Sequence, residues 1–247
     1  MAKQAGLAQE FYAGGYDLSG DVGAIQECSC PRVVLEVTAI NKSARERVNG
    51  LADGKIVFSP WFNDAANQEH AALKGLPTAD VLVMYVDAPT VGQPAACLVA
   101  KQMSYDWRRG NDGSLAGTVE ARGQGNALDW LDMLTAGIRT DTAATNGSSK
   151  DDAAATTYGI VAHLQAFAFT GTSVTVAIQE SSLDGGADPW ATKLSFIAVS
   201  ASRQAERKTA TGTVERYLRV VTTGTFTSAA FAVAYRRGTA QDDVSLA

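Results

Sequence analysis

The sequence is poor in the residues on which most enzymes and metal sites depend. Only two histidines, three cysteines and six prolines occur among its 247 residues. His70 and His163 fall in different parts of the chain, so a catalytic pair or a histidine-rich metal site is not expected. Cys28 and Cys30 are too close for an unstrained disulfide, and with Cys97 they make an odd number, which indicates free thiols in a reducing compartment. We therefore expect no metal and no cofactor.

Catalytic motifs are also missing from the sequence. It contains neither a GxSxG elbow nor a GxxxxGK[ST] loop, and the string that starts at Gly123, GQGNAL, lacks the third glycine of a dinucleotide-binding loop. Asp106, Asp129 and Asp132 lie next to or near tryptophans, and a glycosidase would need two such carboxylates to converge. Nothing in their spacing brings them together, so the sequence favours a protein that is not an enzyme.

Charge and hydropathy exclude two further classes. The chain carries 21 basic and 26 acidic residues, a net charge of −5, which disfavours sequence-independent binding to nucleic acid. The longest apolar stretches, such as residues 160–169, are far shorter than the roughly 20 residues of a membrane-spanning helix. The first ten residues lack the apolar core of a secretory signal, so we expect the product to stay in the cytoplasm in which it is made.

Composition divides the chain into two parts. Residues 140–157, TDTAATNGSSKDDAAATT, contain nothing apolar beyond alanine and are expected to form a linker that is not anchored to a core. We predict a first domain over 1–145, a linker over 146–157, a second domain over 158–238 and a flexible tail over 239–247. The acidic excess belongs wholly to the first part, because the residues after Ser148 include nine acidic and nine basic side chains.

Local signals in the first domain predict strands and two short helices. Residues 32–40 are rich in β-branched side chains and are expected to form a strand. Ser43 and Glu46 then have the spacing of a helix capping box, and Gly54 stands where such a helix would end. A second helix is predicted over 64–74, with Asn63 as its N-cap. Further strands are expected over 55–62, 81–86, 95–107 and 114–123, the last two joined by a tight turn around Asn111, Asp112 and Gly113.

The second domain reads almost entirely as alternating strands. Six are predicted, joined by glycine or serine turns, over residues 158–169, 173–180, 193–199, 204–209, 214–222 and 226–235. This spacing is typical of an antiparallel β-sandwich. The predicted fold class is therefore mainly β.

Several segments resemble a known family. The stretches TAINKSARERVNGLADGKIVFSPWFN, VLVMYV and ACLVAKQMSYDWRRGNDGSLAGTVEARGQGNALDWLDMLTAG, which end at Gly137, resemble the major tail protein, or tail tube protein, of long-tailed bacteriophages. YGIVAHLQAFAFTGTSVTVAIQESSLDG and ERYLRVVTTGTFTSAAFAVAYRRG resemble the extra C-terminal β-sandwich domains that some of these proteins carry on the tube exterior. The resemblance implies a tail-tube-type β-sandwich or barrel with one or two short helices, followed by a C-terminal antiparallel β-sandwich.

The resemblance also implies a structural role in a virion. Subunits of this family form stacked hexameric rings around a channel through which DNA passes, so the expected partners are other copies of the chain and the terminator, tape measure and baseplate proteins. The expected location is the phage tail, after synthesis in the host cytoplasm, with no membrane contact. Six copies at −5 place about −30 on a ring, which repels DNA in transit and does not bind it.

Two regions are candidate contacts between subunits. Residues 1–20 carry isolated aromatics, Phe11, Tyr12 and Tyr16, and form either an arm that docks on a neighbour or a frayed terminus. The hairpin of residues 95–123 forms either part of an inter-subunit barrel or an internal hairpin, and its candidate contact residues are Tyr105, Trp107, Arg108 and Arg109. An alternative function is a carbohydrate-binding or host-adhesion β-sandwich module.

Overall fold

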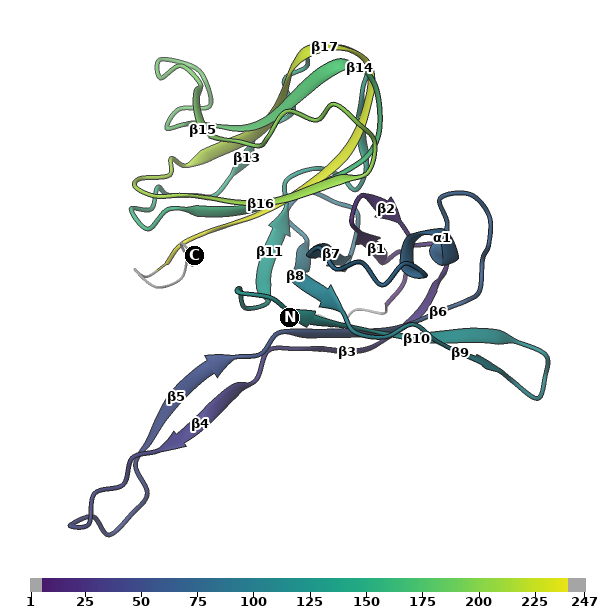
Figure 1. The fold of residues 1–247 in the computed structure, drawn as a ribbon. Coiled ribbons are helices and arrows are strands. Elements are labelled where there is room, and N and C mark those ends of the chain that lie inside the picture. Colours follow the sequence, from purple (N-terminus) through teal and green to yellow (C-terminus); the bar gives the residue numbers. More distant parts are fainter. Residues whose placement is uncertain (1–5, 240–247) are drawn as a thin grey trace.

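A computed structural model describes residues 6–239, which form antiparallel strands and one short helix (Figure 1). The predicted mainly β class is confirmed. Residues 1–5 of the predicted arm and residues 240–247 of the predicted tail lie outside the described residues.

The strands of the first half are short, and a single helix interrupts them. In chain order these elements are β1 (Glu10–Ala13), β2 (Tyr16–Asp17), β3 (Val22–Ser29), β4 (Arg32–Glu36), β5 (Arg47–Ala52), β6 (Lys55–Pro60), α1 (Glu69–Leu73), β7 (Val81–Val86), β8 (Pro94–Gln102), β9 (Asp106–Arg109), β10 (Leu115–Gly123) and β11 (Asp129–Met133). The strand predicted over 81–86 is confirmed with the same bounds. The second predicted helix is real but shorter than expected: Asn63 Oδ1 accepts from the Ala65 amide at 3.1 Å within a turn ahead of α1.

The second half is dominated by two very long strands. Its elements are β12 (Arg139–Asp141), β13 (Lys150–Asp151), β14 (Ile160–Ser181), β15 (Ala191–Ser195), β16 (Gln204–Ala210) and β17 (Tyr217–Arg237). The β14 and β17 strands pair antiparallel along almost their whole length, from Ile160 opposite Arg237 to Ser181 opposite Tyr217. Both strands curve over at the same end of the molecule (Figure 1).

Two glycines explain why the sequence predicted four strands where the structure has two. Gly171 has φ +151° and Gly224 has φ +126°, values that other residues rarely adopt. A Cβ on Gly171 would lie 2.4 Å from Phe226 Cα, and one on Gly224 would lie 2.4 Å from the Ser173 carbonyl oxygen. The glycines bend the strands and let the ladder continue. The predicted breaks at 170–172 and 223–225 are therefore wrong.

Fifteen strands belong to one hydrogen-bonded sheet, whose main path runs β15-β14-β17-β11-β8-β10-β6-β3. Among the strands of residues 6–239, only β4 and β5 stand apart from it, as a two-stranded sheet. Because β17 pairs with β14 on one side and β11 on the other, the sheet continues from the first half of the chain into the second.

Three apolar clusters are packed against this sheet. One lies within the fold of β14 and β17 and includes Ile178 and Phe231. A second belongs to the first half and includes Phe58 and Leu98. The third takes residues from both halves, namely Tyr12, Met84, Val86, Ala95, Cys97, Leu131, Met133, Val161, Ala232 and Ala234. The two halves are therefore joined by shared apolar packing as well as by strand pairing.

The segment predicted as a free linker is paired along β17. At the start of residues 140–157, β12 pairs with β17 with Thr140 opposite Ala230. Further along, β13 pairs with β17 from Lys150 opposite Leu218. Asp141 is buried and accepts hydrogen bonds from Thr222 Oγ1 at 2.7 Å and from Arg139. The expectation that this segment has no anchor is corrected, since backbone pairing and a buried carboxylate hold it where apolar side chains do not. The domain boundaries themselves stay a prediction.

The two bending glycines can be tested by substitution. Gly171→Ala and Gly224→Ala each force a left-handed residue and a backbone clash, so we expect each to lower the free energy of unfolding by at least about 2 kcal/mol. Gly75→Ala is the matched control, because a Cβ there meets nothing within 4 Å. Urea unfolding of the three variants measures the difference. Equal midpoints for all three would contradict the role given to the bends.

Candidate assembly interface

The β4–β5 ribbon is the most exposed apolar feature of the described chain. It extends away from the main sheet as an isolated two-stranded hairpin (Figure 1). Every residue of β4 is exposed, and the apolar side chains on the ribbon and its tip are Val33, Val34, Leu35, Val37, Ile40, Val48 and Leu51. Ile40 and Leu51 are the most open of these, at 107% and 86%.

The short helix predicted between Ser43 and Gly54 is wrong, and the ribbon stands in its place. Glu46, predicted to close a capping box, donates its amide to Thr38 Oγ1 at 3.0 Å and pairs through its carboxylate with Lys42. Its carbonyl accepts from the Val37 amide at 3.0 Å, which continues the hairpin ladder. The neighbouring β-branched residues favour extended backbone, and pairing with β4 outweighs a local capping signal.

Physical chemistry makes this ribbon unusual for an isolated subunit. A two-stranded hairpin without a packed face is at best marginally stable in water. A contiguous exposed apolar surface typically marks a site of association. The ribbon therefore has the properties of a contact surface.

Charge distinguishes the ribbon from the rest of the chain. Residues 32–47 include four basic and two acidic side chains, a net charge of +2. The remaining residues include 17 basic and 24 acidic side chains, a net charge of −7. A basic, apolar projection on an acidic body is electrostatically complementary to the body of another copy.

A second hairpin, β9–β10, projects on the opposite side of the molecule from the β4–β5 ribbon (Figure 1). The predicted turn is confirmed: Asp112 Oδ1 accepts from the amide and the hydroxyl of Ser114 at 3.0 and 2.7 Å, and Gly113 has φ +91°. These hydrogen bonds hold the pKa of Asp112 below its usual value.

The base of this hairpin is an aromatic cluster made by Phe62, His70, Tyr105 and Trp107. The Trp107 ring lies 5.0 Å from Phe62 and 5.3 Å from Tyr105 between centroids, both edge to face. The Tyr105 hydroxyl and His70 Nδ1 share a hydrogen bond of 2.6 Å. The cluster joins the hairpin to α1.

The predicted contact residues separate into two groups. Tyr105 and Trp107 are half-buried at the base of the hairpin, while Arg108 and Arg109 are exposed along it. These four therefore lie together on the β9–β10 hairpin.

The aromatics of the predicted N-terminal arm behave differently. Phe11 and Tyr12 are 2% and 0% exposed, because β1 pairs with β7 and buries them in the chain's own cores. Tyr16 is half-buried, with the Arg203 guanidinium 5.0 Å above its ring. Among the described residues of the predicted arm, Phe11 and Tyr12 thus pack inside this chain, whereas the arm interpretation expects them to dock on a neighbour. Their isolation in a polar stretch hid the short strand that buries them.

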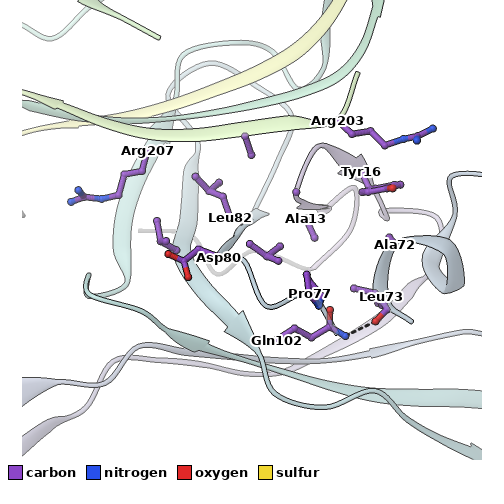
Figure 2. A pocket seen from close by; sticks show the side chains of 14 residues that line it. Ala13, Tyr16, Ala72, Leu73, Pro77, Asp80, Leu82, Gln102, Arg203 and Arg207 are labelled. Atoms are coloured by element: carbon purple, nitrogen blue, oxygen red, sulfur yellow. Dashed lines mark hydrogen bonds between the residues drawn. The ribbon is translucent and has the colours of Figure 1, made fainter. Parts of the chain in front are cut away.

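A cleft of about 380 Å³ lies between the two halves, and Figure 2 shows its lining. Its lining includes Tyr16 of β2, Leu82 of β7 and Gln102 of β8 from the first half. From the second half, Arg207 reaches it from β16 and Arg203 from the residue before that strand. Gln102 Nε2 donates to the Leu73 carbonyl at 2.8 Å, which ties β8 to α1 across one wall. The cleft is therefore part of the packing between the halves.

Asp129, one of the carboxylates considered for catalysis, belongs to a buried ion-pair cluster. Its Oδ2 accepts from His163 Nε2 at 3.0 Å and from Arg207 Nε at 2.9 Å. Burial alone raises the pKa of Asp129, but His163 and Arg207 outweigh it, so this pKa lies below its usual value. Burial lowers the pKa of His163, although Asp129 opposes the effect, so the ring is neutral and donates from Nε2. Both shifts mean that the native state binds fewer protons than the unfolded chain, so the cluster stabilises the fold least in acid.

The remaining candidate groups are dispersed. Asp106 is exposed on β9, and Asp132 on β11 pairs with Lys150 at 3.1 Å. Within residues 6–239 no group of three or more histidine, cysteine, aspartate or glutamate side chains is arranged to hold a metal ion. Cys97 is buried and Cys28 and Cys30 are half-buried, all as free thiols. No helix in the described part of the chain is long and apolar enough to cross a membrane.

Among known proteins, the solved structures that resemble this chain are tail and baseplate components, all at low sequence identity. No protein-family profile and no curated protein matches the sequence. Among solved structures, the tail of an empty gene transfer agent particle with C6 symmetry matches with a TM-score of 0.40 and 18% identity, over 51% of this chain and 97% of that chain. The Dit protein of phage SPP1, described as a hub of the adsorption apparatus, matches with a TM-score of 0.35 and 13% identity, over 93% and 99%. The phage p2 baseplate matches with a TM-score of 0.35 and 9% identity, over 93% and 98%.

The buried cluster around Asp129 predicts a clear stability difference. Asp129→Asn leaves the buried Arg207 without its carboxylate, so we expect a loss of about 3 kcal/mol or more in the free energy of unfolding. Asp106→Asn, an exposed change on β9, should stay within about 0.5 kcal/mol of the wild type. Urea denaturation at pH 7 checks both values. A similar small effect for the two variants would rule out a stabilising role for the cluster.

Proposed function

We propose that this protein is a structural subunit of a bacteriophage-type tail, and more specifically a tail tube subunit that assembles into stacked hexameric rings around a DNA channel. In this proposal other tail proteins are its partners, the virion tail is its location, and residues 158–238 lie on the tube exterior. The protein performs no bond chemistry.

One observation carries the proposal, namely the β4–β5 ribbon with apolar side chains exposed along both strands. A subunit that stayed alone would leave this surface in water at a cost of about 25 cal/mol per Å² of apolar area that association could bury. Contact with another copy would cover the ribbon and stabilise a hairpin that cannot stabilise itself.

Charge supports the same assignment. A contact between the ribbon of one copy and the body of another brings a net charge of +2 to a net charge of −7, which favours association between copies in a head-to-tail sense. A channel lined by this acidic body would repel DNA and let it pass. The solved structures compared above are tail and baseplate components, and the proposal extends a role of that class to this chain on the strength of the ribbon.

The ribbon can be tested without disturbing the fold. Ile40→Asp combined with Leu51→Asp places two carboxylates on its most exposed apolar positions, so we expect assembly to be lost while the thermal unfolding transition stays unchanged. The matched control is Leu183→Asp combined with Ile197→Asp, two apolar residues of the second half that are 58% and 70% exposed. Sedimentation velocity across a concentration series, with negative-stain microscopy of the same samples, measures assembly.

Rings or tubes with a central channel are expected for the wild type and the control variant. The proposal is contradicted if the wild type remains monomeric at high concentration. It is also contradicted if the Ile40 and Leu51 variant assembles as readily as the control.

A further inference from the structure

Glu69, the first residue of α1, is a buried carboxyl group that the proposed assembly does not itself require. It is 0% exposed, and within the described part of the chain no donor reaches either carboxyl oxygen with full hydrogen-bond geometry. An ionised carboxylate without a partner in such a place is strongly unfavourable, so the arrangement fits the neutral acid.

The groups that surround Glu69 come from several elements. Ahead of β3, Asp21 is 6% exposed and accepts from the Glu69 amide at 3.0 Å, so the nearest carboxylate adds like charge. Ahead of β9, the Tyr105 hydroxyl is the polar side chain that acts on Glu69, and the backbone of Asn63 contributes from the β6–α1 connection. Among the described residues, none of the groups that act on Glu69 is a lysine or arginine.

The same cluster holds a second buried polar atom. Trp107 Nε1, on β9, makes no hydrogen bond of full geometry among the described residues, and the Tyr105 hydroxyl is the side chain that acts on it. Tyr105 and Trp107 contact each other edge to face at 5.3 Å, and Tyr105 is bound to His70 of α1. The Tyr105 hydroxyl, which acts on both Glu69 and Trp107, thus belongs to the same cluster as a buried acid and a buried indole at the base of the β9–β10 hairpin.

We propose that Glu69 is a proton-controlled latch for the β9–β10 hairpin: the neutral carboxyl keeps α1 packed against Tyr105 and Trp107, and ionisation loosens that packing. Ionisation leaves a negative charge beside Asp21 in an apolar site. The unfavourable energy of this charge falls when water enters, or when Tyr105 and Trp107 turn their donors toward the carboxylate. Either response moves the hairpin base. If the hairpin contacts another subunit through Arg108 and Arg109, the latch also controls assembly, and that part of the inference rests on the proposed function. The movement of the hairpin itself does not depend on the proposed function.

The direction of the pH effect follows from the raised pKa of Glu69. Burial raises the pKa of Glu69 to about 7, against the smaller opposing influence of the Tyr105 hydroxyl. Between about pH 4.5 and 7 the native state retains a proton that the unfolded chain has released, so the cluster weakens as pH rises through this window. The hairpin is therefore closed in mild acid and loosened above neutrality.

The test uses hydrogen–deuterium exchange of the isolated full chain at pH 5.5 and 8, corrected for intrinsic exchange rates. We expect protection of the β9–β10 amides in the wild type to fall by at least about tenfold, the ratio that corresponds to one pKa unit. Glu69→Gln should show equal protection at both values. Glu120→Gln, an acid of the same hairpin that is ion-paired with Arg122, is the matched control and should behave as the wild type.

Protection that is independent of pH in the wild type, or equally dependent on pH in Glu69→Gln, would overturn the latch. Should Glu69→Gln fail to fold, the carboxyl ¹³C shift of Glu69 in the wild type decides the matter: a titration midpoint well above 4.5 supports the latch, and a midpoint near 4.5 refutes it. Because these readouts use the unassembled chain, their failure is distinguishable from a failure to form rings.

Discussion

The ladder between β14 and β17 is the interaction on which the rest of the structure depends. The two strands span 22 and 21 residues, and β17 also pairs with β11, β12 and β13. One face of the ladder packs into its own folded-over core, and the other contributes Val161, Ala232 and Ala234 to the cluster shared with the first half. The position of β11, and through it β8 and β10, is therefore set by β17. The β4–β5 ribbon and the β9–β10 hairpin extend from this scaffold.

The main sheet and the projecting β4–β5 ribbon differ in how they bury their side chains. Strands of the main sheet bury side chains on packed faces, as β6 does with Ile56 and Phe58 at 0% and 1% exposure. Immediately before β6 in the chain, β4 and β5 bury nothing comparable. Such an abrupt change from core strand to open ribbon within a few residues is expected where a surface completes its packing against another molecule. Assembly in this account replaces the core that the ribbon lacks.

Features specified by local chemistry could be predicted from the sequence. The turn around Asp112 and Gly113 depends on side-chain hydrogen bonds and a positive φ that its own residues supply, and the strand over 81–86 is a continuous apolar run. Features decided at long range could not be predicted. The capping spacing of Ser43 and Glu46 was overridden by pairing with β4, and the glycine turns at 171 and 224 proved to be bends within continuous strands.

At the candidate interface too, local features could be predicted from the sequence and long-range ones could not. Arg108 and Arg109 lie beside a turn that the sequence predicts and are exposed, and their role as contacts between subunits stays a prediction. The sequence predicts Phe11 and Tyr12 as candidate contacts on a neighbouring subunit, because nothing local reveals that β1 pairs with β7, a partner about seventy residues away. The apolar residues of β4 were visible as a β-branched run, but their exposure depends on the absence of a packing partner, which sequence periodicity does not report.

The central claim is that the β4–β5 ribbon is completed by another copy of the chain. Hydrogen–deuterium exchange of residues 32–52, compared between monomer and assembled material from the same preparation, tests it most directly. The account predicts rapid exchange of these amides in the monomer and strong protection in the assembly, with little change in the β14–β17 ladder. Ribbon amides that exchange equally fast in both states would contradict it.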